Sequence, residues 1–277
     1  MTGKLGPIAG NGRFPFLVLE AARRSGRDVT VIALKSETFP ELEELANTPP
    51  AAAVHWLSIG HLGTCIKVLK DAGVREAVMA GQVKHTRLFA DFMPDATLLD
   101  ILVRLKAKNT DSLINGVAEA LRANGIELLD STAFLAPLLA REGVLTRRAP
   151  YDDEQKDLAF AYPIADAIAG MDIGQAIAVK SAAVVAVEAM EGTDALIARA
   201  GALAGAGVRI IKVAKPNQDM RFDVPVVGVS TVEAMAAIGA TTLSVDAGKT
   251  LLIDGDEVIK AADQAAIAIV GRAIRRT

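Results

Sequence analysis

Two polar stretches in the second half of the chain carry the residue types that phosphate chemistry needs. "VEAMEGTDALIARA" (187–200) places three acids, Glu188, Glu191 and Asp194, behind a run that is nearly all Ala and Val. "KVAKPNQDMRFDVP" (212–225) combines lysines, a glutamine, an arginine and aspartates in one connection between predicted strands. Lysine and arginine pair with phosphate oxygens, and carboxylates bind divalent cations. The second stretch therefore favours a site for a phosphate and a divalent ion.

The acids of the first stretch also have a purely structural explanation. Strand alternation over 183–189 puts Glu188 on the face that it shares with Ala186, so Glu188 need not face the core. A helix is expected from about Thr193, and Glu191 and Asp194 suit the positive end of its dipole. By position alone these acids are equally well explained as helix partners and as ligands.

Two glycine-containing turns in the first half are candidates for phosphate contact. "IAGNGRFP" (8–15) lies between a predicted strand and helix, where backbone N–H groups can approach an anion. Pro15 stands where a dinucleotide fingerprint has its third glycine, and "IALKSE" offers Lys35 before Glu37, which disfavours a nicotinamide site. "AGQVKHTR" (80–87) follows another predicted strand, at the sheet edge where α/β proteins bind ligands. A solvated loop explains this stretch equally well, and "MDIGQ" (171–175) taken alone is explained by structure.

The elements that position these residues alternate between strands and helices. In the first half, β-branched runs predict strands at 5–9, 28–34, 52–59 and 76–80, and amphipathic patterns predict helices at 14–26, 63–73, 95–107 and 111–125. This alternation is typical of a parallel sheet with helices on its faces. In the second half we expect strands at 175–180, 183–189, 208–214, 224–229, 250–254 and 266–271, and helices at 193–203, 230–240 and from about 255. Ser230 and Glu233 read as a capping box.

The fold class is therefore α/β with two domains. The polar stretch "TRRAPYDDEQKD" (146–157) interrupts the apolar pattern, so we place the boundary there. We expect an N-terminal Rossmann-like domain with a parallel sheet (1–145) and a distinct C-terminal α/β domain (146–277). We find no internal repeat.

Composition narrows the class of function. The 277 residues carry a formal charge of −3, which disfavours nucleic acid as a partner. One cysteine and three histidines leave too few soft ligands for a zinc cluster, so a metal here is expected to be a hard ion with oxygen ligands. Because no apolar run approaches the length of a signal or membrane span, we expect a soluble cytoplasmic chain.

The motifs resemble one family along essentially the whole chain. "IAGNGRFP", "MAGQVK", "DIGQ", "VEAMEGTDALI" and "KPNQDMRFDVPVVGV" occur in the order and spacing of the UDP-2,3-diacylglucosamine pyrophosphatases of the LpxI type. The resemblance is densest from 171 to 229. Gln82 stands where many relatives have Asn, "GNG" replaces three glycines, and His61 occupies a position that often carries an acid.

The resemblance implies an activity and a cofactor. Such enzymes hydrolyse the pyrophosphate of UDP-2,3-diacylglucosamine in lipid A biosynthesis, releasing UMP and 2,3-diacylglucosamine 1-phosphate (lipid X), with Mg²⁺ or another divalent cation such as Mn²⁺. The resemblance also implies that the active site lies between the two domains. The aspartate of the family's R-x-D-x-P motif corresponds to Asp223, and its E-G-T-D cluster corresponds to residues 191–194.

From this correspondence we expect the following site. Asp223 and Asp194 bind the metal, and Asp223, Asp194 and Glu191 are the catalytic candidates. Substrate-binding roles are expected for Gly10, Asn11, Gly12, Gly81, Gln82, Gln175, Glu188, Thr193, Lys212, Lys215, Gln218 and Arg221.

Partners and rival functions follow from the same residues. The expected partner is a lipid-linked nucleotide sugar, with peripheral contact at the inner membrane surface and a homodimer as open expectations. Phe89, Phe92, Met93 and Leu98 in 89–105 fit either a membrane-contacting lip or an ordinary core helix. The alternative functions are an NAD(P)-dependent oxidoreductase on the N-terminal domain and a non-catalytic nucleotide-lipid sensor.

Overall fold

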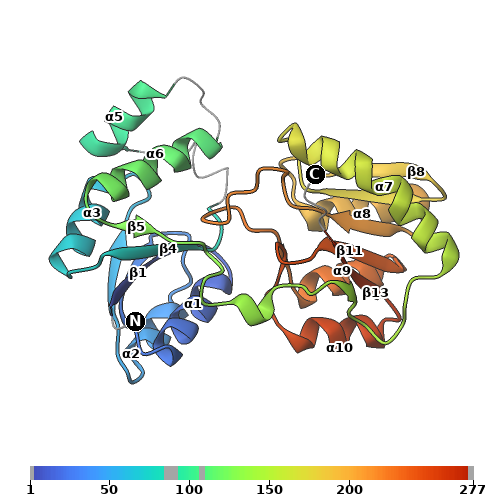
Figure 1. Cartoon of the computed structure of the whole chain (residues 1–277), viewed down its shortest axis with the longest axis horizontal. Coiled ribbons are helices and arrows are strands. Elements are labelled where there is room, and N and C mark those ends of the chain that lie inside the picture. The colour runs from blue at the N-terminus through green and yellow to red at the C-terminus, as the bar shows by residue number, and fades with distance from the viewer. Residues whose placement is uncertain (1–2, 84–92, 106–109, 274–277) are drawn as a thin grey trace. The chain divides into compact units, whose positions relative to one another are not determined.

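The computed structural model describes residues 3–83, 93–105 and 110–273. The chain divides into two compact units (Figure 1). The first contains residues 1–135 and 220–223, and the second contains residues 136–219 and 224–277. No helix in the described ranges is long and apolar enough to cross a bilayer.

The first unit is built on a five-stranded parallel sheet in the order β3-β2-β1-β4-β5. Helices α1 and α2 lie on one face of this sheet, and α3 and α6 lie on the other, with α5 beyond them (Figure 1). Its elements are β1 Lys4–Ala9, α1 Phe14–Arg24, β2 Asp28–Leu34, α2 Glu41–Asn47, β3 Ala53–Leu57, α3 Leu62–Asp71, β4 Glu76–Ala80, α5 Ala96–Arg104, α6 Thr110–Ala123 and β5 Glu127–Leu128.

The strand order of the first unit creates a switch point between β1 and β4. The chain leaves β1 toward β2 on one side and returns later to place β4 on the other side. In open α/β sheets the ligand crevice lies at such a point, outside the carboxyl ends of the strands. The Rossmann-like parallel sheet predicted for this half is confirmed.

The second unit contains a six-stranded mixed sheet in the order β6-β13-β11-β9-β7-β8 and a two-stranded sheet of β10 and β12. Strands β9, β11 and β13 are parallel, whereas β7 runs antiparallel to β9 and β8 antiparallel to β7. Its elements are the 3-10 turn η1 Ala136–Leu138, β6 Gly143–Val144, α7 Asp152–Gly170, β7 Ala176–Lys180, β8 Ala183–Val187, α8 Thr193–Ala204, β9 Arg209–Lys212, β10 Val226–Val227, α9 Val229–Ala237, β11 Thr242–Asp246, β12 Leu251–Leu252, α10 Asp256–Gln264 and β13 Ala268–Arg272.

Alternating side chains of this sheet form two cores. Ile210 of β9 packs into the cluster that includes residues of α8, α9 and α10, and Ile211 packs into the cluster that includes residues of α7. Both side chains are fully buried. The period of two along the strand thus produces a helix–sheet–helix sandwich, which confirms a second α/β domain.

Several predicted boundaries differ from the structure. The units divide at Leu135/Ala136 rather than at 145/146, because η1 and β6 belong to the second unit. There, the Ala140 N–H donates to Thr250 O at 2.9 Å, and β6 pairs with β13. The stretch 146–157, interpreted as a connector, already contains the first turns of α7.

The predicted capping box is wrong. Helix α9 is capped at Gly228, and the Val229 N–H donates to Asp254 Oδ2 at 2.9 Å. The cap therefore comes from the loop after β12, a long-range contact that the local pattern does not contain. Helices α2 and α7, and strands β5, β6 and β11, were not predicted.

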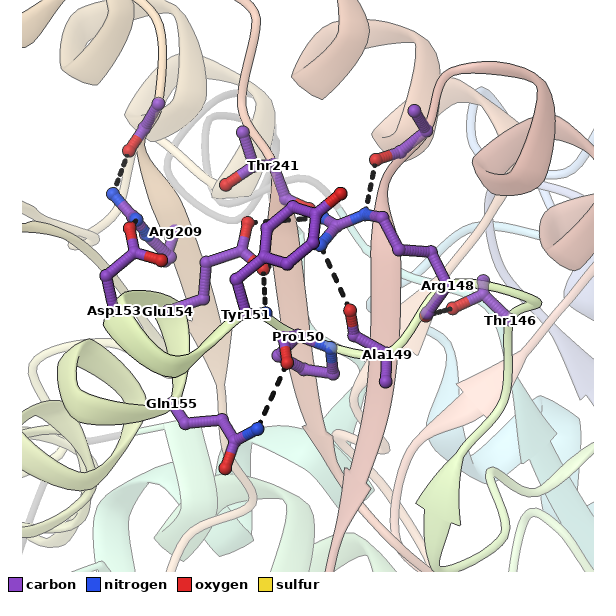
Figure 2. Close-up of polar contacts among 12 residues, drawn as sticks. Thr146, Arg148, Ala149, Pro150, Tyr151, Asp153, Glu154, Gln155, Arg209 and Thr241 are labelled. Atoms are coloured by element: carbon purple, nitrogen blue, oxygen red, sulfur yellow. Dashed lines mark hydrogen bonds and ion pairs between the residues drawn. The ribbon is translucent and has the colours of Figure 1, made fainter.

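A polar clasp ties the start of α7 to the amino ends of the parallel strands (Figure 2). The Arg148 guanidinium donates two hydrogen bonds to Glu154, at 2.7 and 3.2 Å, and a further bond to the Thr241 carbonyl. The Tyr151 N–H donates to Glu154 Oε2 at 2.7 Å. Beside it, Arg209 at the start of β9 forms ion pairs with Asp153 and Asp157. The clasp fixes where α7 begins.

The polar clasp lowers the pKa of Glu154, a residue that is 2% exposed. Burial alone would raise the pKa of Glu154, but the hydrogen bonds from Arg148 and the Tyr151 backbone outweigh it and lower the pKa to about 2. Because the folded-state pKa lies below the unfolded value, the ionised clasp stabilises the fold above pH ~4.5. This contribution is lost as the pH falls toward the folded-state pKa.

We therefore predict that Glu154→Gln lowers the free energy of unfolding at pH 7 by about 3 kcal/mol. Urea unfolding at pH 7 and at pH 3 is the measurement, and the difference between wild type and variant should shrink at the lower pH. Glu257→Gln, which removes the exposed pair with Lys260, serves as the control and should change stability little. An undiminished difference at pH 3 would contradict the charged clasp.

Candidate functional site

Three motif segments of the second unit meet at the carboxyl edge of its parallel strands. Lys212 ends β9, Gln175 precedes the neighbouring β7, and Glu188 follows β8. Because β7 and β8 alternate in direction, the start of β7 and the end of β8 fall at the same edge as the end of β9. "DIGQ", "VEAMEGTD" and "KVAKPNQ" are thereby brought together by the sheet.

The centre of this site is the buried carboxylate of Glu188, which is 8% exposed. Its Oε1 accepts the Thr193 hydroxyl at 2.7 Å, and its Oε2 accepts the Gln175 N–H at 3.1 Å. Thr193 Oγ1 in turn accepts a hydrogen bond from Lys212 Nζ at 2.9 Å. We call Glu188, Thr193 and Lys212 the polar relay. A carboxylate and an ammonium joined through one hydroxyl form a fixed polar pair.

The backbone around the polar relay is close-packed. The Glu188 N–H donates to Ala176 O at 2.9 Å, and the Val213 N–H donates to Gln175 O at 2.8 Å. Gly174 lies against Glu188 so closely that a Cβ at this position would overlap the Glu188 carbonyl. This contact gives the glycine of "DIGQ" a physical role that the sequence analysis did not assign.

The loop after β9 is held by its own polar contacts. The Lys215 N–H donates to Gln218 Oε1 at 3.0 Å, and Gln218 N–H donates back to the Lys215 carbonyl at 2.9 Å. The Lys215 ammonium pairs with Asp172 at 2.6 Å, and Asp172 has a left-handed backbone with φ of 58°. Asp172 was interpreted as structural, and the structure adds its ion pair with a predicted phosphate-binding lysine.

The remaining acids of the first stretch differ in environment. Asp194 is exposed in the first turn of α8, which begins after Gly192, as predicted for a helix-dipole partner. Glu191 is also exposed, and its carboxylate pairs with Arg199 at 2.5 Å. Hydrogen bonds from its own backbone N–H and from Ala189, together with Arg199, lower the pKa of Glu191. A carboxylate held ionised by an arginine is a weak proton acceptor.

Asp223 belongs to a segment that the first unit holds. The Ser131 N–H donates to the Met220 carbonyl at 2.8 Å, and the Ser131 hydroxyl donates to the Arg221 carbonyl at 2.7 Å. Phe222 is buried, whereas Asp223 is exposed and has a left-handed backbone with φ of 55°. Ser131 is 1% exposed and was not predicted, since nothing local in the sequence marks it.

The Arg221 side chain contacts α6 of the first unit. Its guanidinium donates to Asn115 Oδ1 at 3.2 Å, and it lines a groove with Arg122, Glu119 and Glu127. The predicted role of Arg221 in binding pyrophosphate stays a prediction.

The two glycine turns of the first unit interlock at its switch point. The Asn11 N–H donates to Gln82 O at 2.7 Å, and the Asn11 side-chain amide donates to Glu37 O at 3.1 Å. A Cβ at Gly10 or Gly81 would overlap the opposing backbone, and Gly12 and Gly81 have φ of 89° and 90°. Both turns therefore require glycine, and they place their backbone groups where open sheets bind ligands.

The predicted residues between 84 and 98 have different outcomes. Lys84, His85 and Arg87 of "AGQVKHTR", and Phe89 and Phe92 of the predicted lip, lie outside the described residues. Leu98 of the same stretch is buried against the core of the first unit, which agrees with the core-helix explanation for this residue.

No group of three or more His, Cys, Asp or Glu side chains is placed to hold a metal within 3–83, 93–105 and 110–273. Mg²⁺ in enzymes is commonly bound by one or two carboxylates, with water and substrate phosphates completing its shell. Exposed single carboxylates such as Asp194 and Asp223 fit that type of site. Glu188 does not, because both of its oxygens already accept hydrogen bonds.

Taken together, the fold and these contacts define a two-unit α/β protein with polar motif clusters at the carboxyl edges of its sheets. Family models match both halves: the LpxI N-terminal domain over residues 4–138 and the LpxI C-terminal domain over residues 141–270. The chain is also similar to the UDP-2,3-diacylglucosamine pyrophosphatase LpxI of Caulobacter vibrioides, with 32% identity over 97% of each chain. The chain belongs to the LpxI family.

The polar relay leads to a test of Thr193. Thr193→Val keeps the shape but leaves the buried Glu188 carboxylate without its hydroxyl donor, so we expect a loss of about 1–3 kcal/mol in unfolding free energy. Thr193→Ser keeps the hydroxyl and should lose well under half of that. Denaturant unfolding of the two variants is the measurement, and equal losses would show that the hydroxyl does not carry the effect.

Proposed function

We propose that this protein hydrolyses the pyrophosphate bond of UDP-2,3-diacylglucosamine to UMP and 2,3-diacylglucosamine 1-phosphate in lipid A biosynthesis. The observation that carries the proposal is family membership along the whole chain, combined with the convergence of the family's polar motifs on one edge of the second sheet. In the reaction, a water oxygen bonds to one phosphorus and the bridging oxygen leaves with the other, so each product is a phosphomonoester.

Phosphoanhydride hydrolysis needs charge neutralisation and a placed water, and little covalent work from the protein. In the proposal, the Lys212 ammonium, held by Thr193, neutralises pyrophosphate oxygens, and Lys215 supplies a second positive charge. The backbone groups of the two glycine turns, Gly10–Gly12 and Gly81–Gln82, bind the nucleotide part of the substrate. Glu188 keeps Thr193 and Lys212 in position and does not react itself.

Asp223 is the proposed catalytic carboxylate. Its left-handed backbone is uncommon for a residue other than glycine, and such conformations concentrate at functional positions. Asp223 is exposed while its neighbour Phe222 is buried, so the side chain is presented by an anchored segment. Glu191, ionised beside Arg199, is assigned a supporting charge and no proton transfer.

A divalent ion, Mg²⁺ or Mn²⁺, is part of the same proposal. Asp194 and Asp223 would hold it, as exposed carboxylates of the kind that share Mg²⁺ with water and substrate oxygens. The ion would supply Lewis acidity toward phosphoryl oxygen. Peripheral contact with a membrane surface is proposed as well, since the substrate is diacylated and Leu99 and Val103 of α5 are exposed.

The central test is incubation of the protein with UDP-2,3-diacylglucosamine and Mg²⁺, with UMP and the lipid product followed by mass spectrometry. We expect Asp223→Asn to reduce kcat by a factor of about 1000 or more, because a neutral amide replaces the proposed catalytic carboxylate. Asparagine tolerates the left-handed backbone, so the variant should remain folded.

A control variant accompanies this test. Ser181→Asn changes another left-handed residue, in the turn between β7 and β8 and away from the proposed site, and it should retain most of the turnover. Wild-type turnover by Asp223→Asn would refute the catalytic assignment. Binding of the substrate by wild type without release of UMP would instead favour a nucleotide-lipid sensor.

The proposed metal is tested by chelation. We expect exhaustive EDTA treatment to stop UMP release and added Mg²⁺ or Mn²⁺ to restore it, because uncompensated pyrophosphate charge opposes attack. Calcium added at the same concentration controls for non-specific charge screening. Undiminished UMP release after chelation would remove the metal from the proposal.

A further inference from the structure

Three large apolar side chains are exposed beside the polar relay. Met171 is 63% exposed, Ile173 is 46% exposed and Met190 is 72% exposed. We call these three residues the apolar rim. Isolated exposed apolar side chains are common on any protein, but apolar side chains that border a polar site are typical of ligand pockets.

Backbone contacts place the apolar rim next to the relay. Gly174 packs directly on the Glu188 carbonyl, so the segment that carries Met171 and Ile173 runs beside the end of β8. Met190 follows Glu188 by two residues in the turn before α8. Asp172, which lies between Met171 and Ile173 in the sequence, forms an ion pair with Lys215. This ion pair ties the segment of Met171 and Ile173 to the loop after β9.

The polar contacts of this segment leave its apolar side chains on the surface. Asp172 and Gln175 turn to the loop after β9 and to the relay, while Met171 and Ile173 project into solvent. Exposed apolar area of this kind gains free energy when a ligand covers it.

We propose that the apolar rim receives the acyl chains of the substrate. This inference rests on the proposed function and assigns a part of the substrate to named residues. In a diacylglucosamine 1-phosphate, the acyl groups are attached to the sugar that carries the phosphate, so an apolar surface must begin close to the groups that bind phosphate. The rim is such a surface, carried by the segments that contain Gln175 and Glu188.

The rim has the composition expected of a surface that accepts long, flexible chains. Methionine is unbranched and polarisable, and it adapts to partners of different shape. Met171 and Met190 border the relay from different segments, one at the end of α7 and the other after β8. Chain length would then be measured by how far an acyl group extends along these residues.

The test compares the triple variant Met171→Ser/Ile173→Ser/Met190→Ser with Leu203→Ser. Leu203 is 66% exposed on α8 and lies outside the rim, so it matches the chemistry and exposure of the changes. Calorimetry measures binding of 2,3-diacylglucosamine 1-phosphate with long acyl chains and of the same compound with acetyl groups. Steady-state UMP release from the corresponding UDP-sugars is measured in parallel.

We expect the triple variant to weaken binding of the long-chain lipid, and to raise its KM, by about tenfold, because apolar contact area is lost. Affinity for the acetylated compound and kcat should stay within about twofold of wild type. Leu203→Ser should resemble wild type throughout. A loss that is equal for long and short chains, or no loss in either, overturns the proposal.

The design separates this inference from the proposed function. A wild-type protein that releases no UMP but binds the long-chain lipid through the rim would refute hydrolysis and keep the rim assignment. A protein that releases UMP with unchanged KM in the triple variant would refute the rim and keep hydrolysis.

Discussion

The cost of removing a carboxylate from water is the constraint on which the second unit's site depends. The Glu188 carboxylate is buried, and a buried carboxylate must be hydrogen-bonded because an uncompensated buried charge costs several kcal/mol. Its two oxygens are satisfied by Thr193 and by the Gln175 backbone. That requirement fixes the start of α8, the entry into β7 and, through Thr193, the ammonium of Lys212. The same interaction thus stabilises the edge of the sheet and orients a cation there.

The sequence predicted the strands and helices well where periodicity is strong, and the site only in part. Strands β2 and β4 have the predicted bounds because β-branched and apolar residues dominate them and charged residues or glycine flank them. Strand β11, "TLSVD", was missed because its buried Thr242, Ser244 and Asp246 are polar, and Ser244 and Asp246 are satisfied by long-range partners. The hydroxyls of Ser244 and Tyr162 share a hydrogen bond, and Asp246 accepts a hydrogen bond from Arg272. No local sequence pattern reveals these two contacts.

For the site, the motifs predicted which segments carry it, and the fold shows what each residue contacts. Glu188 was predicted to bind substrate, and its buried carboxylate accepts a hydrogen bond from Thr193. Glu191 was predicted to be catalytic, and its carboxylate pairs with Arg199. Gly174 and Ser131 act through backbone contacts, which depend on which segments become neighbours and so cannot be predicted from residue type.

The segment Met220–Asp223 has a consequence for how such proteins can be rearranged. It lies within the stretch matched by the C-terminal family model, yet it packs with the first unit, while the chain on either side belongs to the second. A cut at 135/136 would separate this segment from Ser131, whose N–H and hydroxyl donate to the Met220 and Arg221 carbonyls. A first half produced alone would lack a segment with which it packs, and a second half produced alone would carry that segment without those hydrogen bonds.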